Sequence, residues 1–382
     1  MHVENRALAR LTDAQRRALG HVRKTVEERR ADARAHLLTI LSSSGCPSVI
    51  LDAAAESIRE HARVILHFHP DRIGVKPITV AEALLEDGQY RSQFETGLSS
   101  GSLTAFPGGA RDRWEETLFG GAYHGRDSSV GDRPKYGALE LIRYPDGPWP
   151  RFGCCYFVLR EEAAWRTSFT FSGSEQPDAA ERLGTIDQVE CVLVPLLAEV
   201  ASGAGAKVPW PPFVAPTLGV ENLTVRGLLE RVSNGLGSRR ATPSSGMAGR
   251  VLDTGIEAQV HGPIEMERDI ERLVADPAFI GTPTGGRVEE LSHKYAFPLD
   301  WHCGFRLGTR DVPDEFRGPA VPKLARRIAG DGIVDAAVIG AAQRSLRLCP
   351  EGCRDWGTPE AALEDLKRLW HVLVHFGAPA RP

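Results

Sequence analysis

The hydrophobic and polar positions along the chain divide it into three parts, of which the first is helical. Residues 11–41 carry sparse apolar positions among many charged ones, which predicts a mostly solvent-exposed helical arm or hairpin. Thr12 suits the N-cap of this helix, because Gln15 follows three residues later as in a capping box. A second, short helix is expected over residues 48–61. Residues 1–60 are therefore predicted to form a helical N-terminal segment.

The middle part, residues 61–290, mixes strand and helix patterns. The β-branched and aromatic run at 63–69 predicts a strand, and a helical pattern at 78–88 ends at Gly88. Further strands are predicted at 135–144, 152–160, 165–174 and 256–266, and helices at 187–202 and 221–232. A Pro/Gly-rich connector is expected at 203–219, and a Gly/Ser-rich loop with three arginines at 233–250. These patterns predict an α+β domain.

The last part, residues 291–382, is again helical in pattern. Helices are expected over 321–330, 333–349 and 358–377. In the last of these Thr358 is suited to the N-cap, Pro359 to the first helical position and Gly377 to the end. We therefore expect a helical C-terminal segment behind the α+β domain.

Composition narrows the class of protein. The chain has 382 residues, of which 42% are hydrophobic and 25% charged, as in ordinary globular proteins. The formal net charge of −4 gives no general attraction to nucleic acid or to an anionic membrane. No apolar run approaches the ~20 residues of a membrane span, and the charged N-terminus does not resemble a secretory signal. We expect a cytoplasmic protein without membrane partners; delivery into another cell by a route that needs no signal stays open.

Two groups of residues suggest metal chemistry. HFHPD, residues 67–71, places His67 and His69 on one face of a strand with Asp71 close by, an arrangement found in metal-dependent hydrolases. The alternative is that these are hydrogen-bonded structural histidines. His302, Cys303, Cys349 and Cys353 suggest zinc, although the C-x3-C spacing is a loose match. The seven cysteines show no disulfide-like spacing and are expected to be reduced.

A third motif, GGAYHGRDSSVGDRPKYG at 120–137, carries a family resemblance. Together with the strand at 63–69 and the helix at 78–88, it resembles the catalytic domain of ADP-ribosyltransferases of the diphtheria-toxin and poly-ADP-ribose-polymerase type. His67 or His69 resembles the histidine of the family's first strand. Gly120, Gly121 and Tyr123 are similar to its Gly-x-x-Tyr segment, and Ser128, Ser129 and Tyr136 to its Ser-rich stretch and closing tyrosine. The wider chain also resembles a family of bacterial proteins with no assigned function.

The resemblance implies a fold, a co-substrate and a site. The fold would be an ADP-ribosyltransferase-like split sheet, mixed or antiparallel, and the co-substrate NAD. Tyr123 and Tyr136 would hold the nicotinamide ring between them by stacking and cation–π attraction. Glycines such as Gly121 would let the backbone approach the carboxamide, and the histidine would bond a ribose hydroxyl.

The same resemblance assigns a catalytic carboxylate. Glu257, on the strand predicted after the flexible loop, would bond the 2′-hydroxyl of the nicotinamide ribose. It would stabilise the positive charge that develops as the glycosidic bond breaks. Arginine-modifying relatives carry Gln or Glu two residues earlier, where this chain has Gly255, so modification of arginine is disfavoured. Loop 233–250 would recognise the acceptor.

Several further residues are candidates for NAD binding. Ser168, Thr170 and Ser172 alternate on one strand like the Ser-Thr-Ser strand of arginine-type transferases, or form an edge strand with a hydroxyl-lined solvent face. Arg91, Arg111 and Arg113 suit a diphosphate, or are solvated surface residues. The predicted catalytic residues are Glu257, His67 and Tyr123. The predicted cofactor-binding residues are His67, His69, Arg91, Gly121, Tyr123, Ser129, Tyr136 and Ser168.

The sequence thus supports one leading hypothesis and two alternatives. The leading one is an NAD-consuming ADP-ribosyltransferase that releases nicotinamide and transfers ADP-ribose to a protein or nucleic-acid acceptor, or to water. The second is a metal-dependent hydrolase that uses HFHPD. The third is a non-catalytic effector or binding module that docks a partner through its terminal helices.

Overall fold

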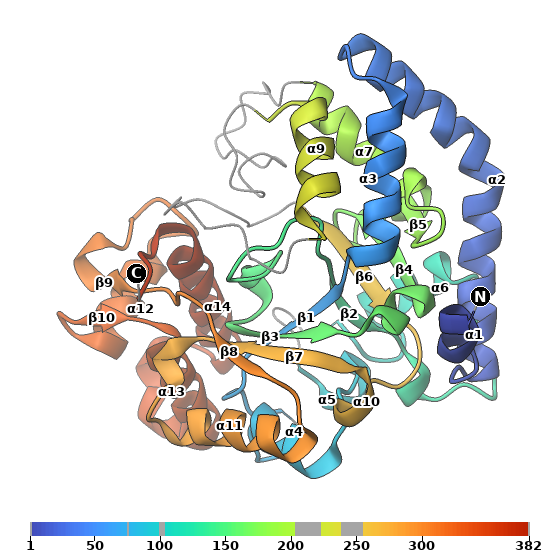
Figure 1. Cartoon of the computed structure of the whole chain (residues 1–382). Coiled ribbons are helices and arrows are strands. Elements are labelled where there is room, and N and C mark those ends of the chain that lie inside the picture. Colours follow the sequence, from blue (N-terminus) through green and yellow to red (C-terminus); the bar gives the residue numbers. More distant parts are fainter. Residues whose placement is uncertain (1, 75, 99–103, 203–222, 238–254, 381–382) are drawn as a thin grey trace.

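The structure is a computed structural model that describes residues 2–74, 76–98, 104–202, 223–237 and 255–380 (Figure 1). The predicted connector at 203–219 and most of the predicted loop at 233–250 lie outside these residues. Helices and one large mixed sheet make up the described chain, which confirms the α+β class.

An eight-stranded sheet forms the centre of the described residues. Its order is β5-β4-β6-β2-β1-β3-β7-β8, and neighbouring strands are antiparallel except for the parallel pair β7 and β8. The strands are β1 (Val64–Phe68), β2 (Lys135–Leu139), β3 (Cys155–Leu159), β4 (Thr167–Phe171), β5 (Leu183–Thr185), β6 (Ile256–Val260), β7 (Ile270–Ala275) and β8 (Leu299–Trp301). A small two-stranded sheet pairs β9 (Leu307–Gly308) with β10 (Ile333–Val334).

Helices surround this sheet in three groups (Figure 1). The group in the upper and right-hand part of the view is α2 (Asp13–Ser43), α3 (Ser48–His61), α7 (Glu190–Ala201) and α9 (Val225–Gly235), with α1 (His2–Leu8) lower on the right. Toward the bottom lie α4 (Val80–Asp87), α5 (Gln93–Thr96), α10 (Met266–Asp269) and α11 (Pro283–Tyr295), while α6 (Ala110–Leu118) lies near α2. The third group, on the left, is α12 (Ala320–Ala329), α13 (Ala336–Leu348) and α14 (Pro359–Phe376).

The N-terminal helix α2 begins as predicted, and most of its residues are exposed, as expected, while one narrow face is buried. Thr12 and Gln15 form the expected capping box. Val22, Val26 and Leu37 are each fully buried, and α2 packs against α7 and β5. A narrow stripe of valines, leucines and small alanines is therefore enough to attach this largely exposed helix to its neighbours.

The predicted division at residue 290 does not coincide with a structural boundary. It falls inside α11, which packs on α4. The strand β8, from the segment expected to be helical, extends the central sheet beside β7. Helix α14 itself begins at Pro359 after the N-cap Thr358 and ends before Gly377, as predicted. A strand of three residues at the edge of the sheet carries too little pattern to be recognised in the sequence.

The ladder between β1 and β2 is unusually short. These strands pair only at Val64 with Leu139 and at Ile65 with Ala138, whereas β1 pairs with β3 at four positions. Beyond the paired positions, a Cβ atom on Gly137 would lie 2.3 Å from the Ile65 carbonyl oxygen. The absence of a side chain at Gly137 is therefore what allows β1 and β2 to meet at this point before their ladder ends.

We expect Gly137→Ala to destabilise the protein by about 2 kcal/mol, because the added methyl group must displace backbone. Gly286→Ala in α11 is the control, since a Cβ there would meet nothing within 4 Å. It should leave stability unchanged or raise it by a few tenths of a kcal/mol up to about 1 kcal/mol. Urea denaturation of both variants measures the difference; equal stabilities would contradict the proposed close contact.

Candidate functional site

A cavity of about 570 Å³ lies where the β1–β2 ladder ends. The ends of these two strands, Glu257 of β6 and the segment 76–98 with α4 and α5 contribute to its wall. Its apolar lining includes Phe68, Ile78, Leu84, Trp149 and Phe152. The volume falls within the range of about 300–1,000 Å³ that is usual for ligand sites. Polar and charged side chains make up the rest of the wall.

The strand registers bring three of the predicted site residues to this cavity. Glu257 is opposite Ala138, which in turn is opposite Ile65, and His67 lies two residues after Ile65 on β1. Because side chains alternate along a strand, His67, Tyr136 and Glu257 share one face of the sheet. All three line the cavity. Residues that are 190 positions apart in the sequence are thereby placed around one space.

Glu257 is a buried carboxylate with one fixed oxygen. Its Oε1 accepts hydrogen bonds from the backbone N–H of Ser174 at 3.1 Å and from Nε2 of Gln259 at 3.0 Å. Its Oε2 accepts no hydrogen bond from any residue that the structure describes, and the residue is 8% exposed. Burial raises the pKa of Glu257, while the charge of Arg111 opposes this rise. One oxygen is thus available to a ligand in the cavity.

A strained turn delivers the Ser174 N–H to Glu257. Ser172, at the end of β4, has a φ of 68°, which a residue with a side chain rarely adopts. Its N–H donates to the carbonyl oxygen of Gly255 at 2.7 Å, which ties the turn to the residue before β6. Strain of this kind, of order 1–3 kcal/mol, is found mainly where function requires a fixed geometry.

His67 is held in one tautomer. The backbone N–H of Trp149 donates to its Nε2 at 3.4 Å, and its Nδ1 lies 3.1 Å from the carbonyl oxygen of Gly153. Since the carbonyl can only accept, Nδ1 carries the proton and the ring is neutral. His67 therefore presents a fixed ring edge to the cavity.

Tyr136 stands between an arginine and a buried glutamate. The guanidinium of Arg111, on α6, lies 4.2 Å from the centroid of its ring, and the Tyr136 hydroxyl donates to Glu115 Oε1 at 2.8 Å. Glu115 is fully buried, and Arg133 donates to its other oxygen at 2.8 Å. Burial raises the pKa of Glu115, and Arg133 counteracts this. The Glu115–Arg133 pair thus fixes the ring of Tyr136 from behind.

The cavity contains more positive than negative side chains. Its lining carries five cations (Arg72, Lys76, Arg91, Arg111 and Lys135) and three carboxylates (Asp87, Glu95 and Glu257). Arg91 is already bonded to Asp87 at 2.7 Å and to Glu95 at 3.1 Å, which weakens its predicted role toward NAD. Nε and Nη1 of Arg111 are buried without a hydrogen-bond partner among the described residues. An anionic ligand would supply that partner.

Four of the predicted site residues do not line the cavity. Tyr123 is 3% exposed and packs edge-on against Phe119. Ser168 is fully buried between β4 and β6. Gly121, with a φ of 71°, belongs to a turn, and Ser129 caps a short helix by bonding Asp132. Tyr123 therefore does not face Tyr136 across the cavity, and the expected pair of stacked tyrosines needs correction: the tight glycine turn directs Tyr123 into the core.

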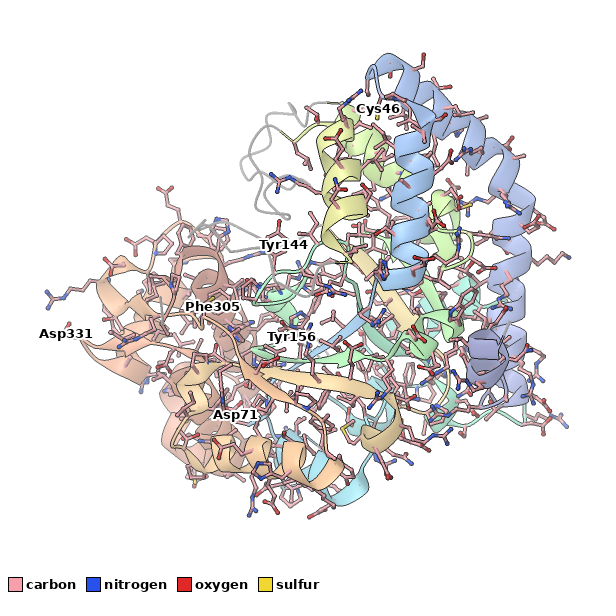
Figure 2. The ribbon with its side chains drawn as sticks, in the orientation of Figure 1. Cys46, Asp71, Tyr144, Tyr156, Phe305 and Asp331 are labelled. Atoms are coloured by element: carbon pink, nitrogen blue, oxygen red, sulfur yellow. The ribbon has the colours of Figure 1, made fainter. Side chains whose placement is uncertain are left out.

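The two metal predictions are not supported by the placement of their residues. Within the described ranges, no group of three or more His, Cys, Asp or Glu side chains could hold a metal ion. Asp71, after β1, packs its carboxylate against Gly340 of α13 (Figure 2), and His69 lies 3.3 Å from the Cys154 sulfur. Nε2 of His302 lies 2.9 Å from the carbonyl oxygen of Cys154. His69 does line the cavity, as predicted for a ligand-binding residue.

Two important residues were missed in the sequence. Gln259 and His261 follow Glu257 at two-residue spacing, and both are fully buried. In IEAQVHG the polar residues alternate with Ile256, Ala258 and Val260, so that one face of a buried strand is entirely polar. Such a strand is unusual because buried polar groups need partners. This alternation was the signal that could have identified them.

Comparison with protein families matches residues 63–376 to the family described as Protein of unknown function (DUF3626). The match extends over most of the chain, so the protein belongs to this family. It starts directly before β1 and ends with the last residue of α14, so the family unit contains the sheet, the cavity and the C-terminal helices. No curated protein matches the chain.

No helix in the described part of the chain is both long enough and apolar enough to cross a membrane. This finding agrees with the absence of an apolar run in the sequence.

We expect Arg133→Met to destabilise the protein by about 3–5 kcal/mol, because it leaves the buried Glu115 carboxylate without its counter-charge. The loss should shrink as the pH is lowered from 8 to 5. Without Arg133 the pKa of Glu115 in the folded state lies further above its unfolded value, so the folded protein takes up a proton over this range. Urea denaturation as a function of pH measures this.

Two controls separate charge from packing. Adding Glu115→Gln to Arg133→Met should restore much of the stability, whereas Arg91→Met, at a pair with an exposed guanidinium, should cost about 0–1 kcal/mol. A pH-independent loss without rescue by Glu115→Gln would show that the Arg133 side chain acts through packing alone.

Proposed function

We propose that this protein cleaves NAD at the bond between nicotinamide and ribose and transfers the ADP-ribose to an acceptor. The observation that carries the proposal is the convergence of His67, Tyr136 and Glu257 on one cavity, with a free oxygen on a buried carboxylate. These residues come from three neighbouring strands. Along the chain they follow one another in the order His, Tyr, Glu on which the resemblance to ADP-ribosyltransferases rests.

The cavity has the chemical features that NAD requires. An aromatic ring at Tyr136 suits stacking with the flat pyridinium, which is positively charged before cleavage. The diphosphate carries negative charge, and Arg111 has two buried N–H groups that lack partners among the described residues. Both ring nitrogens of His67 already bond backbone groups, so its fixed, neutral ring would contribute packing against the ligand and not the predicted hydrogen bond to a ribose hydroxyl.

Glu257 would act on the ribose. As the bond between C1′ and the nicotinamide nitrogen breaks, its electron pair leaves with the nicotinamide, which departs neutral, and C1′ becomes positively charged. A carboxylate placed beside the ribose stabilises that charge, and its low-dielectric surroundings strengthen the effect. The acceptor then forms the new bond to C1′ and loses a proton. Because Oε1 of Glu257 already holds two donors, Oε2 is the oxygen available for this role.

The residue before β6, Gly255, limits which acceptor we propose. A Cβ atom on Gly255 would lie 3.3 Å from the indole of Trp149, so this position has little room for the Gln or Glu side chain found in arginine-modifying enzymes. We therefore propose an acceptor other than arginine. The loop at 233–250, expected to recognise the acceptor, lies mainly outside the described residues.

We expect Glu257→Gln to lower the rate of nicotinamide release by at least about a hundredfold, while NAD affinity stays within about threefold. Chromatographic detection of nicotinamide and calorimetry with NAD measure the two quantities. Burial raises the pKa of Glu257, so the acid limb of the wild-type rate profile should lie above pH 4.5. Glu175→Gln, at an exposed carboxylate nearby, is the control. An equal loss in both variants, or none in either, contradicts the role of Glu257.

We expect Arg111→Gln to weaken the binding of ADP-ribose by about tenfold or more, because a charge-assisted hydrogen bond contributes about 1.5–3 kcal/mol. Arg113→Gln, two residues further along α6 and exposed, should leave affinity unchanged. Calorimetric titration of both variants with ADP-ribose tests this. Equal affinities for the two variants would mean that the diphosphate does not bind at Arg111.

A further inference from the structure

A continuous chain of buried hydrogen bonds runs behind the cavity from Tyr123 to Glu257. The Tyr123 hydroxyl lies 2.5 Å from Nδ1 of His261, and Nε2 of His261 lies 3.2 Å from the Ser168 hydroxyl. Ser168 donates to Oε1 of Gln259 at 2.8 Å, and Nε2 of Gln259 donates to Oε1 of Glu257 at 3.0 Å. We infer that Tyr123 and His261, acting through Ser168 and Gln259, are positioning residues for the Glu257 carboxylate.

The direction of this chain follows from the chemistry of its members. Nε2 of Gln259 donates both to Glu257 and to the Thr170 hydroxyl at 3.1 Å, so its Oε1 is the acceptor for Ser168. Ser168 uses its single proton there and can only accept from His261. His261 therefore carries its proton on Nε2, and its Nδ1 accepts from Tyr123. Every donor in the chain points toward Glu257.

Burial makes the chain rigid. Ser168, Gln259 and His261 are each fully buried, so solvent cannot replace a lost partner. His261 also stacks at 15° to the ring of Tyr123, and Phe119 packs edge-on against both rings. A fully satisfied network in such surroundings holds one arrangement, because any broken bond leaves an unpaired polar group.

Burial and the surrounding charged groups keep His261 and Tyr123 of this hydrogen-bond chain uncharged. Burial, together with Arg166 and Lys135, lowers the pKa of His261 to about 3. Burial, with Glu115 and Asp132, raises the pKa of Tyr123, while Arg133 opposes this rise. At the other end Glu257 faces Arg111 and Glu175. Near neutral pH, His261 is thus a neutral imidazole with one ring proton and Tyr123 keeps its hydroxyl proton, so the chain acts as a row of fixed dipoles.

Two of these residues were expected to touch NAD, and their position outside the cavity gives them a different role. Tyr123 and Ser168 do not line the cavity, but both lie on the path that ends at Glu257. This inference rests on the proposed function, since Glu257 is the residue whose orientation it explains. Its structural part, the direction of the chain, can be tested without turnover.

The activity test is a double-mutant cycle of Tyr123→Phe and Ser168→Ala, with nicotinamide release from NAD as the readout. Each single variant should lower kcat by about tenfold, with KM for NAD within about twofold, because Tyr123→Phe removes one hydrogen bond of the chain and Ser168→Ala removes two. The double variant should be no slower than Ser168→Ala alone. Losses that multiply to about a hundredfold, or an unchanged kcat in Tyr123→Phe, would overturn the inference.

Tyr156→Phe is the matched control (Figure 2). Tyr156 is 5% exposed, comparable to Tyr123, and its hydroxyl donates to the carbonyl oxygen of Pro145 at 2.9 Å, outside the chain. We expect its kcat to stay within about twofold of the wild type. A tenfold loss in Tyr156→Phe as well would show that loss of any buried tyrosine hydroxyl slows the enzyme, and would overturn the specific role of Tyr123.

Nuclear magnetic resonance tests the chain independently of turnover. In protein with ¹⁵N-labelled histidine, the His261 signal, assigned by its loss in His261→Gln, should show the Nε2–H tautomer and should shift toward Nδ1–H in Tyr123→Phe. In protein with ¹³C-labelled glutamate, the Glu257 carboxyl should titrate at a higher pH in Tyr123→Phe than in the wild type. An Nδ1–H tautomer in the wild type, or an unchanged Glu257 titration, overturns the inference. A wild type that does not cleave NAD overturns only the proposed function.

Discussion

The early end of the β1–β2 ladder is the constraint on which the site depends. A sheet whose central strands paired along their full length would leave no space between His67 and Tyr136. Here the strands pair at two positions, approach closely at Gly137 and then bound the cavity. The flanking strands β3 and β6 keep their full pairing, so the opening is held by rigid neighbours on both sides.

The site contains two buried carboxylates, Glu115 and Glu257, and the protein stabilises their negative charges in two different ways. Glu115 has a full counter-charge in Arg133, which makes it a structural group. Glu257 instead receives neutral donors on one oxygen and faces Arg111 across the site. This looser compensation suits the role proposed for Glu257, because a tight ion pair would neutralise the charge of its carboxylate.

Local elements were largely predictable, because their signals are short-range. The capping box at Thr12, the end of a helix at Gly88 and the strand before HFHPD depend on neighbouring residues alone. The polar face of β6 was also readable, although only Glu257 was recognised on it. Tyr123 was assigned incorrectly because a tyrosine after two glycines has the same local pattern whether its ring faces a ligand or the core.

The sequence by itself determined the α+β class, most of the helices and strands of the described residues, and the set of polar residues from which a site could be built. Tertiary structure decided which of them meet. His67, Tyr136 and Glu257 share a cavity because the strand order places β6, β2 and β1 side by side, whereas Tyr123 and Ser168 lie behind it. Strand order and register arise from contacts between residues far apart in the chain, which no local pattern encodes.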